Sequence, residues 1–218
     1  MGRSVLKKKR VLITAGPTWV PIDDVRVLSN VSSGQLGLLL AQEAVKLGFK
    51  TDLFLGPVCG NIAFRESLKL FRFRYFDELF SLIKSNLSVK KYDLILHCAA
   101  VSDYVCVCKN GKISSEKEAL VLRFKKAPKL IHLIRRLNPR ALLVMFKLES
   151  GVKETELIKR ALSAMKCAKA DLTVANYFKG QQYKGFILDG HGNIITKAFS
   201  RQEMARNLFG VFQKGLVR

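Results

Sequence analysis

The chain has 218 residues, 49% of them hydrophobic, which suits one good-sized domain with a full core. Its 38 Lys and Arg against 17 Asp and Glu give a formal net charge of +21. This charge favours polyanionic partners such as nucleic acid, a membrane surface or phosphorylated metabolites, and a merely solvated basic surface is an equally open interpretation. No apolar run approaches the roughly 18 residues of a membrane span, and five cysteines without CxxC spacing indicate free thiols, so we expect a soluble, cytoplasmic protein.

Apolar runs alternate with amphipathic segments along the chain, which predicts alternating strands and helices. We expect strands near residues 10–15, 50–55, 69–74, 92–98, 119–124, 141–146 and 171–176. We expect helices at residues 34–48, 76–88, 128–138 and 153–168, and a last one near 200–214. Several strands are continuously apolar, as parallel strands covered on both faces are. The pattern predicts an α/β fold, with a Rossmann-like, doubly wound, mostly parallel sheet and helices on both faces.

The organisation of the chain indicates a single domain over 1–218, with a basic lead-in at 1–9 and no internal repeat. Loops are short except at 16–32, 56–66, 99–118 and 177–184. In open parallel sheets, ligands bind beyond the carboxyl ends of the strands. The loops at 16–32 and 99–118 are therefore the candidate site.

Several familiar catalytic motifs are missing. The only Gly-Lys pair, Gly111-Lys112, precedes Ile113 instead of the Ser or Thr of a P-loop. Only Gly34 and Gly37 remain of a dinucleotide fingerprint, so a Rossmann-type NAD(P)-dependent oxidoreductase stays the weaker alternative. GxSxG is absent, and the three histidines are scattered, so no hydrolase triad or metal site is indicated. A basic nucleic-acid-binding module is a further alternative, supported only by the charge.

The first candidate segment runs from Arg26 through Asn30 to Ser32, Ser33, Gly34 and Gly37. Small residues at a helix start let phosphate oxygens approach backbone N–H groups, where the helix dipole favours negative charge. An ordinary helix start with a serine cap would have the same sequence. Thr18 and Gly16 lie in the same long loop, directly after the first strand.

Three further segments lie at expected strand ends. Ala99-Ala100 leave room for a ligand beside main-chain amides, and Asp103 can accept hydrogen bonds, although a turn-forming Asp is the simpler interpretation. Lysines at 112, 125, 126 and 129 could neutralise a triphosphate, or could simply be solvated. Phe146 could stack on a base and Asn176 could read its edge, unless Phe146 belongs to the core.

In this order, the segments resemble the phosphopantothenoylcysteine synthetase family, from about Arg10 to the VAN strand and more weakly beyond. The likeness rests on VLITAGPT, on DDVRVLSNVSSGQLG and on AAVSDY. KISS, KAPK and MFKLE depart from the bacterial form that is fused to a flavin decarboxylase and look like the stand-alone branch. The resemblance implies a phosphopantothenate–cysteine ligase that uses CTP or ATP with Mg²⁺, without assigning metal ligands.

The resemblance also implies roles for individual residues. Asn30 and Lys112 would be catalytic, with Lys112 on a flap over the active site, and Arg26 would reach in from the partner subunit of a homodimer. Phosphopantothenate would be bound by Arg26, Asn30, Ala99, Ala100 and Asp103. The nucleotide would be bound by Gly16, Thr18, Ser32, Ser33, Gly34, Gly37, Lys126, Pro128, Phe146 and Asn176.

Overall fold

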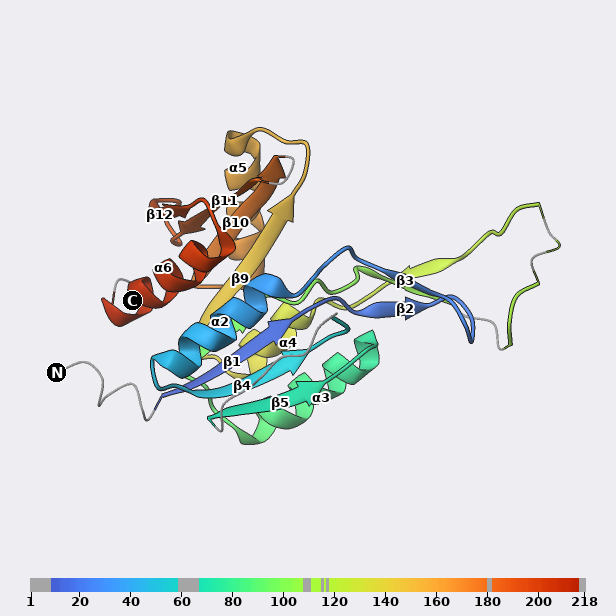
Figure 1. Ribbon diagram of the computed structural model, residues 1–218, viewed down its shortest axis with the longest axis horizontal. Coiled ribbons are helices and arrows are strands. Elements are labelled where there is room, and N and C mark those ends of the chain that lie inside the picture. Colours follow the sequence, from blue (N-terminus) through green and yellow to red (C-terminus); the bar gives the residue numbers. More distant parts are fainter. Residues whose placement is uncertain are drawn as a thin grey trace.

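A computed structural model of the chain describes residues 9–58, 67–107, 111–114, 116, 118–179 and 182–215. Its centre is an eight-stranded sheet in the order β12-β11-β10-β9-β6-β1-β4-β5 (Figure 1). The parallel strands are β1 (Arg10–Ala15), β4 (Lys50–Leu55), β5 (Leu68–Arg72), β6 (Leu94–His97), β9 (Leu142–Glu149) and β10 (Leu172–Lys179). The antiparallel edge consists of β11 (Gln182–Leu188) and β12 (Ile194–Ala198).

The chain winds outward from the middle of this sheet in two directions. From β1 it passes to β4 and β5 on one side, and from β6 to β9 and β10 on the other. β1 and β6 are therefore neighbours at the point where the order reverses, which is where doubly wound sheets bind ligands. The predicted fold class is confirmed.

Five helices cover the two faces of the sheet within the described part of the chain (Figure 1). On one face α2 (Gln35–Lys46) and α6 (Arg201–Gln213) pack on alternate β1 residues, including Val11 and Ile13. On the other face α3 (Phe76–Val89) and α4 (Leu130–Leu137) form a second core with Leu12. α5 (Glu154–Ala168) covers β10 on this second face. Helices cover both faces of β1, which explains why its residues from Val11 to Ala15 are buried and mostly apolar.

Two antiparallel ribbons project from the carboxyl ends of the strands (Figure 1). The first pairs β2 (Trp19–Pro21) with β3 (Val27–Ser29), and the second pairs β7 (Tyr104–Cys106) with β8 (Phe124–Lys126). We refer to them as the first and second ribbons. β2 lies beside β7, so the two ribbons form one projection.

The ribbons and the antiparallel edge differ from the sequence-based expectations. The strand expected at 119–124 is wrong: the chain takes up regular pairing only at Phe124, and Val121 before it is 86% exposed. The segment ALVLRF has the composition of a strand, but only its last residue, Phe124, pairs with another strand. The loop expected at 177–184 is largely the β10–β11 hairpin. Residues 1–8 of the lead-in and 59–66 of the 56–66 loop lie outside the described residues.

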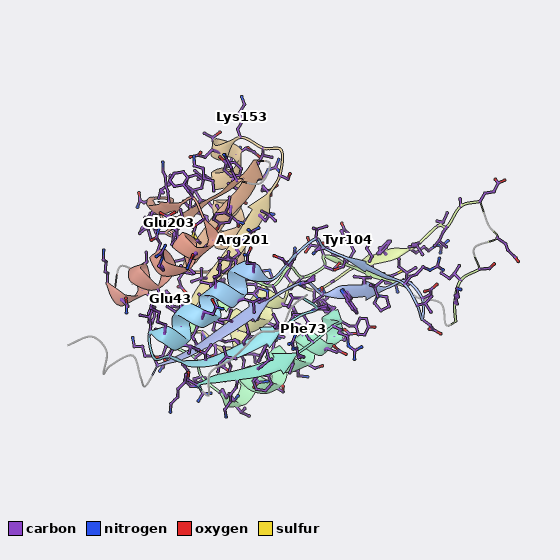
Figure 2. All side chains as sticks on the ribbon, viewed as in Figure 1. Glu43, Phe73, Tyr104, Lys153, Arg201 and Glu203 are labelled. Carbon is purple, nitrogen blue, oxygen red and sulfur yellow. The ribbon has the colours of Figure 1, made fainter. Side chains whose placement is uncertain are left out.

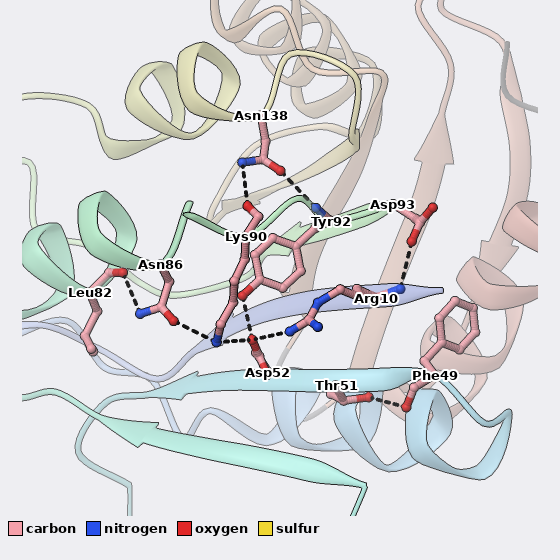
Figure 3. A network of polar contacts seen from close by, with 10 residues as sticks. All are labelled: Arg10, Phe49, Thr51, Asp52, Leu82, Asn86, Lys90, Tyr92, Asp93 and Asn138. Carbon is pink, nitrogen blue, oxygen red and sulfur yellow. Dashed lines mark hydrogen bonds and ion pairs between the residues drawn. The ribbon is translucent and has the colours of Figure 1, made fainter. Parts of the chain in front are cut away.

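A buried carboxylate organises the end of the sheet opposite the ribbons. Asp52 on β4 accepts hydrogen bonds from the Tyr92 hydroxyl at 2.6 Å and from Lys90 Nζ at 3.0 Å, and Arg10 approaches it at 3.5 Å (Figure 3). Burial and the adjacent carboxylate raise the pKa of Tyr92, so its hydroxyl remains a donor. The cluster therefore ties β4 to the segments that enter β1 and β6.

Replacing Asp52 by Ala should destabilise the protein by about 3 kcal/mol, because it leaves partly buried cations and a buried hydroxyl without their shared acceptor. Urea unfolding measures the loss. Glu43→Ala is the matched control, because its i,i+3 pair with Lys46 spans 3.8 Å and Lys46 is exposed. The control should cost less than about 0.5 kcal/mol. Equal losses in the two variants would contradict a stabilising role for the Asp52 cluster.

Candidate functional site

The loops that follow β1 and β6 are joined to each other by main-chain hydrogen bonds. Ala100 N–H donates to the Gly16 carbonyl at 2.9 Å, and Thr18 N–H donates to the Ala100 carbonyl at 3.2 Å. Pro17 and Ala100 form an isolated parallel bridge. The pairing of β1 with β6 thus continues past the strands into the two loops that the sequence marks as the candidate site.

Two buried threonine hydroxyls reinforce this connection. Thr18 Oγ1 accepts from Ser102 N–H at 2.9 Å, and Thr14 Oγ1 accepts from Ala99 N–H at 3.2 Å. Thr14 Oγ1 also lies 2.9 Å from His97 Nδ1. Both threonines are 0% exposed, so their polar groups are used inside the protein. Sequence reasoning missed Thr14, although a single Thr in the apolar strand RVLITA was a signal for such a bond.

Asn30 extends the network from the first ribbon. Its Nδ2 donates to the Ala100 carbonyl at 3.1 Å and lies 3.4 Å from the Val101 carbonyl. The predicted residues Asn30, Ala99 and Ala100 are therefore brought together. Asp103 follows in the same loop, and its carboxylate forms an ion pair with Lys129.

Neither His97 nor Cys98, at the end of β6, supplies a charged catalytic group at neutral pH. Burial lowers the pKa of His97 to about 4, so the imidazole is neutral. Burial raises the pKa of the Cys98 thiol to about 12, so it is not a thiolate. Both side chains are therefore uncharged at neutral pH.

The start of α2 lies so close to the loops after β1 and β4 that two positions require glycine. Gly34, the N-cap of α2, and Gly16 both have positive φ, at 68° and 79°. A Cβ on Gly34 would lie 2.7 Å from Val58 Cγ1. Ser32 and Ser33 make only long contacts of 3.4 Å to main-chain N–H groups, and the Gly34 N-cap carries no side chain to cap the helix. The opening N–H groups of α2 can therefore serve an anion.

Gly37 has a packing role that the sequence alone did not indicate. It is buried on α2, and a Cβ there would lie 2.3 Å from the Ala15 Cβ on β1. This close approach holds the opening turn of α2 against β1. Its predicted contact with a nucleotide stays a prediction.

The other predicted nucleotide residues lie on separate elements along the same edge. Phe146 on β9 packs against the core beneath α2 and α6, and Asn176 on β10 is 7% exposed. Their strands are parallel neighbours. Lys126 on β8 is exposed, and Pro128 follows between β8 and α4.

A cavity of about 760 Å³ adjoins this edge on the α2–α6 face. Gln35, directly after Gly34, and Tyr177, directly after Asn176, line it together with Arg201 at the start of α6. Figure 2 labels Arg201 on α6, the helix that packs beside α2. Of the predicted residues, Gly34 and Asn176 adjoin lining residues in sequence, and none of them lines the cavity itself.

Arg26 lies away from the Asn30–Ala100 contact. It precedes Asn30 by four residues of an extended ribbon, or roughly 13 Å of chain. Its guanidinium binds the Asp23 carboxylate, with Nε at 2.9 Å, and Nη2 donates to the Ile113 carbonyl at 2.9 Å. Lys112, next to Ile113, is exposed at this distant position. The structure therefore brings Arg26 and Lys112 together, but not beside Asn30 of the same chain.

Within the described ranges, no three His, Cys, Asp or Glu side chains come together so that they could hold a metal ion. Nor is any helix there long and apolar enough to cross a membrane.

Comparison with known proteins shows the family to which the chain belongs. The family model for the DNA/pantothenate metabolism flavoprotein C-terminal domain matches residues 6–211. The chain belongs to this family. Both joined loops, both ribbons and the start of α2 lie within the matched region.

Relatives agree with this assignment. The coenzyme A biosynthesis bifunctional protein CoaBC of Thermococcus kodakarensis is 34% identical over 215 residues, which are 97% of this chain and 52% of the relative. The chain thus spans about half the length of that curated relative. The structure of the DNA/pantothenate metabolism flavoprotein from Streptococcus pneumoniae is 25% identical, with a TM-score of 0.85 over 94% of this chain and 99% of the other.

A third comparison is with a solved structure that holds a ligand. The Cab2 mutant H337A, described as a complex with phosphopantothenate-cysteine, has a TM-score of 0.79 and 18% identity, over 97% of this chain and 88% of that protein. At this identity the likeness shows a shared fold.

Replacing Gly37 by Ala should destabilise the domain by about 1–3 kcal/mol, because the new methyl group would overlap with Ala15 Cβ on β1. Gly210→Ala on α6 is the matched control, since no described atom outside its own helix lies within 4 Å of the added carbon. That control should stabilise the protein by about 0.5–1 kcal/mol. Thermal unfolding of both variants measures the difference. Unchanged stability in Gly37→Ala would contradict the close packing of α2 on β1.

Proposed function

We propose that this domain joins 4′-phosphopantothenate to cysteine in coenzyme A biosynthesis, with CTP or ATP as the activating nucleotide. The observation that carries the proposal is the contact of Asn30 with the Ala100 carbonyl, which brings together two motifs of the family. The start of α2, whose opening N–H groups can serve an anion, lies at the same edge and follows Asn30 closely in the chain. The family membership and the CoaBC relatives support this substrate class.

The proposed chemistry is two substitutions. The phosphopantothenate carboxylate attacks the α-phosphorus of the nucleotide, an oxygen–phosphorus bond forms, and pyrophosphate leaves. The amine of cysteine then attacks the acyl carbon of the anhydride, forming an amide and releasing the nucleoside monophosphate and a proton. Asn30 and the Ala99–Ala100 segment would hold the acyl group, and Lys112 would offset charge on the transferring phosphate. No protein nucleophile is required, which agrees with the neutral Cys98 thiol.

Mg²⁺ is expected for a triphosphate substrate, but the described residues do not assemble a protein site for it. Asp103 is a carboxylate in the joined loops, and Lys129 already pairs with it. We derive no step through the metal ion and assign no residue to it.

Pyrophosphate release tests the proposal. The purified protein is incubated with Mg²⁺, 4′-phosphopantothenate and either CTP or ATP, with and without cysteine. Release that requires phosphopantothenate supports acyl activation, and the faster nucleotide identifies the preferred one. Absence of release with both nucleotides would reject the proposal.

Lys112→Gln should lower the rate of pyrophosphate release on the order of 10²–10³-fold, because a positioned cation near the transferring phosphate is lost. Phosphopantothenate should still bind, as measured by calorimetry. Lys159→Gln on the exposed surface of α5 is the control for charge and should keep the wild-type rate. Wild-type turnover in Lys112→Gln would remove Lys112 from the mechanism.

We also propose that the two ribbons form the interface of a homodimer. They expose Leu28 at 50%, Tyr104 at 55% and Phe124 at 38%, on a projection separate from the core. Large apolar side chains gathered on one surface are typical of protein–protein contacts. The position of Arg26, far from Asn30 of its own chain, supports its predicted insertion into the partner's site.

Mixing two inactive variants tests this arrangement. Asn30→Asp and Arg26→Ala should each be inactive alone. In a mixed dimer, one site would combine the intact Asn30 with the partner subunit's Arg26, so an equal mixture should recover about a quarter of wild-type activity after subunit exchange. Failure of exchanged, mixed dimers to recover activity would contradict sharing of Arg26 between subunits.

A further inference from the structure

Asp23, at the turn of the first ribbon, is a buried carboxylate with a full set of partners. Its side chain is 0% exposed. Oδ1 accepts from Val25 N–H at 3.0 Å and from Arg26 N–H at 2.8 Å, which fixes the turn. Oδ2 accepts from the Arg26 guanidinium and from Ile113 N–H at 3.0 Å. One carboxylate therefore joins two segments that are 90 residues apart in sequence.

Asp23 and Arg26 together hold both polar groups of the Ile113 main chain. Asp23 accepts from the Ile113 N–H, while Arg26 Nη2 donates to the Ile113 carbonyl at 2.9 Å. Hydrogen bonds to ionised groups are roughly twice as strong as neutral ones. The hydrogen bond with Arg26 holds the pKa of Asp23 well below its usual range, so the carboxylate stays ionised near neutral pH.

Lys112 directly precedes the residue that is held. Gly111, on its other side, has a positive φ of 83°, and a Cβ added there would meet no described heavy atom within 4 Å. Lys112 itself is exposed. The Asp23–Ile113 contact thus holds the main chain next to Lys112, while the Lys112 side chain is exposed.

We propose that Asp23 is a positioning residue for Lys112: by binding the Ile113 main chain, it fixes the start of the Lys112 side chain relative to Arg26. Lys112 and Arg26 then act as one unit and enter the same active site. This inference rests on the proposed function for its effect on catalysis, but the contact itself can be tested without any activity. A cation that must meet a transferring phosphate loses much of its effect when its backbone moves by about an ångström.

Asp23→Asn tests the contact with little change to the turn. The amide oxygen can still accept from Val25 and Arg26 N–H, while the amide nitrogen can accept neither from Ile113 N–H nor from the Arg26 guanidinium. Asp24→Asn is the matched control, because Asp24 is the adjacent, exposed carboxylate and the charge change is the same. Ile113→Pro removes the donor from the opposite side and should reproduce the effect of Asp23→Asn. It leaves the Asp23–Arg26 pair in place and so separates the two losses.

The first readout is the rate at which trypsin cleaves after Lys112 in the folded protein, followed by mass spectrometry. Asp23→Asn should be cleaved several-fold faster than wild type, and Asp24→Asn at the wild-type rate. Because trypsin does not cut before proline, Ile113→Pro is scored by the second readout alone. Unchanged cleavage in Asp23→Asn would overturn the proposal, whether or not the protein is a ligase. Circular dichroism establishes that each variant is folded before it is scored.

The second readout is steady-state kinetics of pyrophosphate release. Asp23→Asn and Ile113→Pro should each lower kcat about ten-fold or more with little change in KM for phosphopantothenate, because Lys112 acts in the transition state. Faster cleavage of Asp23→Asn with an unchanged kcat would overturn the positioning role. An inactive wild-type enzyme would reject the proposed function instead. The cleavage assay would still show whether Asp23 holds the main chain at Ile113.

Discussion

The joining of the β1 and β6 loops is the constraint on which the site depends. β1 and β6 are adjacent because the chain winds outward in both directions from them. Their pairing continues through Gly16 and Ala100, and the buried hydroxyls of Thr14 and Thr18 fix the main chain on either side. A substrate held by Asn30 and Ala100 would therefore rest on one rigid surface, which is what catalysis by positioning requires.

Close packing places the start of α2 on the same surface. α2 can approach β1 because Gly37 lies directly over Ala15, and Gly34 fits beside Val58 for the same steric reason. These glycines serve the site by admitting neighbouring groups. The Asp52 cluster, at the opposite end of the sheet, anchors the strands far from the site (Figure 3). The Asp52 cluster and the candidate site thus lie at opposite ends of the same sheet.

The sequence predicted the sheet class and the five helices because burial produces clear periodic patterns in them. It failed for the ribbons because β3 and β8 are exposed at every position and carry no such pattern. The same exposure led to the wrong strand at 119–124, where apolar residues face solvent. The positions of the family motifs could be predicted because the sequence resembles the family there. The role of Asp23 could not, because it lies in a contact to a main-chain group 90 residues away. Thr14 was missed although a single Thr in an apolar strand signals a buried hydrogen bond.

Labelling the phosphopantothenate carboxylate with oxygen-18 would test most directly whether this carboxylate attacks the α-phosphorus of the nucleotide. After turnover with cysteine, mass spectrometry locates the label. We expect one labelled oxygen in the nucleoside monophosphate and none in pyrophosphate. Label in inorganic phosphate, which would indicate attack on the terminal phosphorus, or product formed without transfer of label to the nucleotide, would contradict this mechanism.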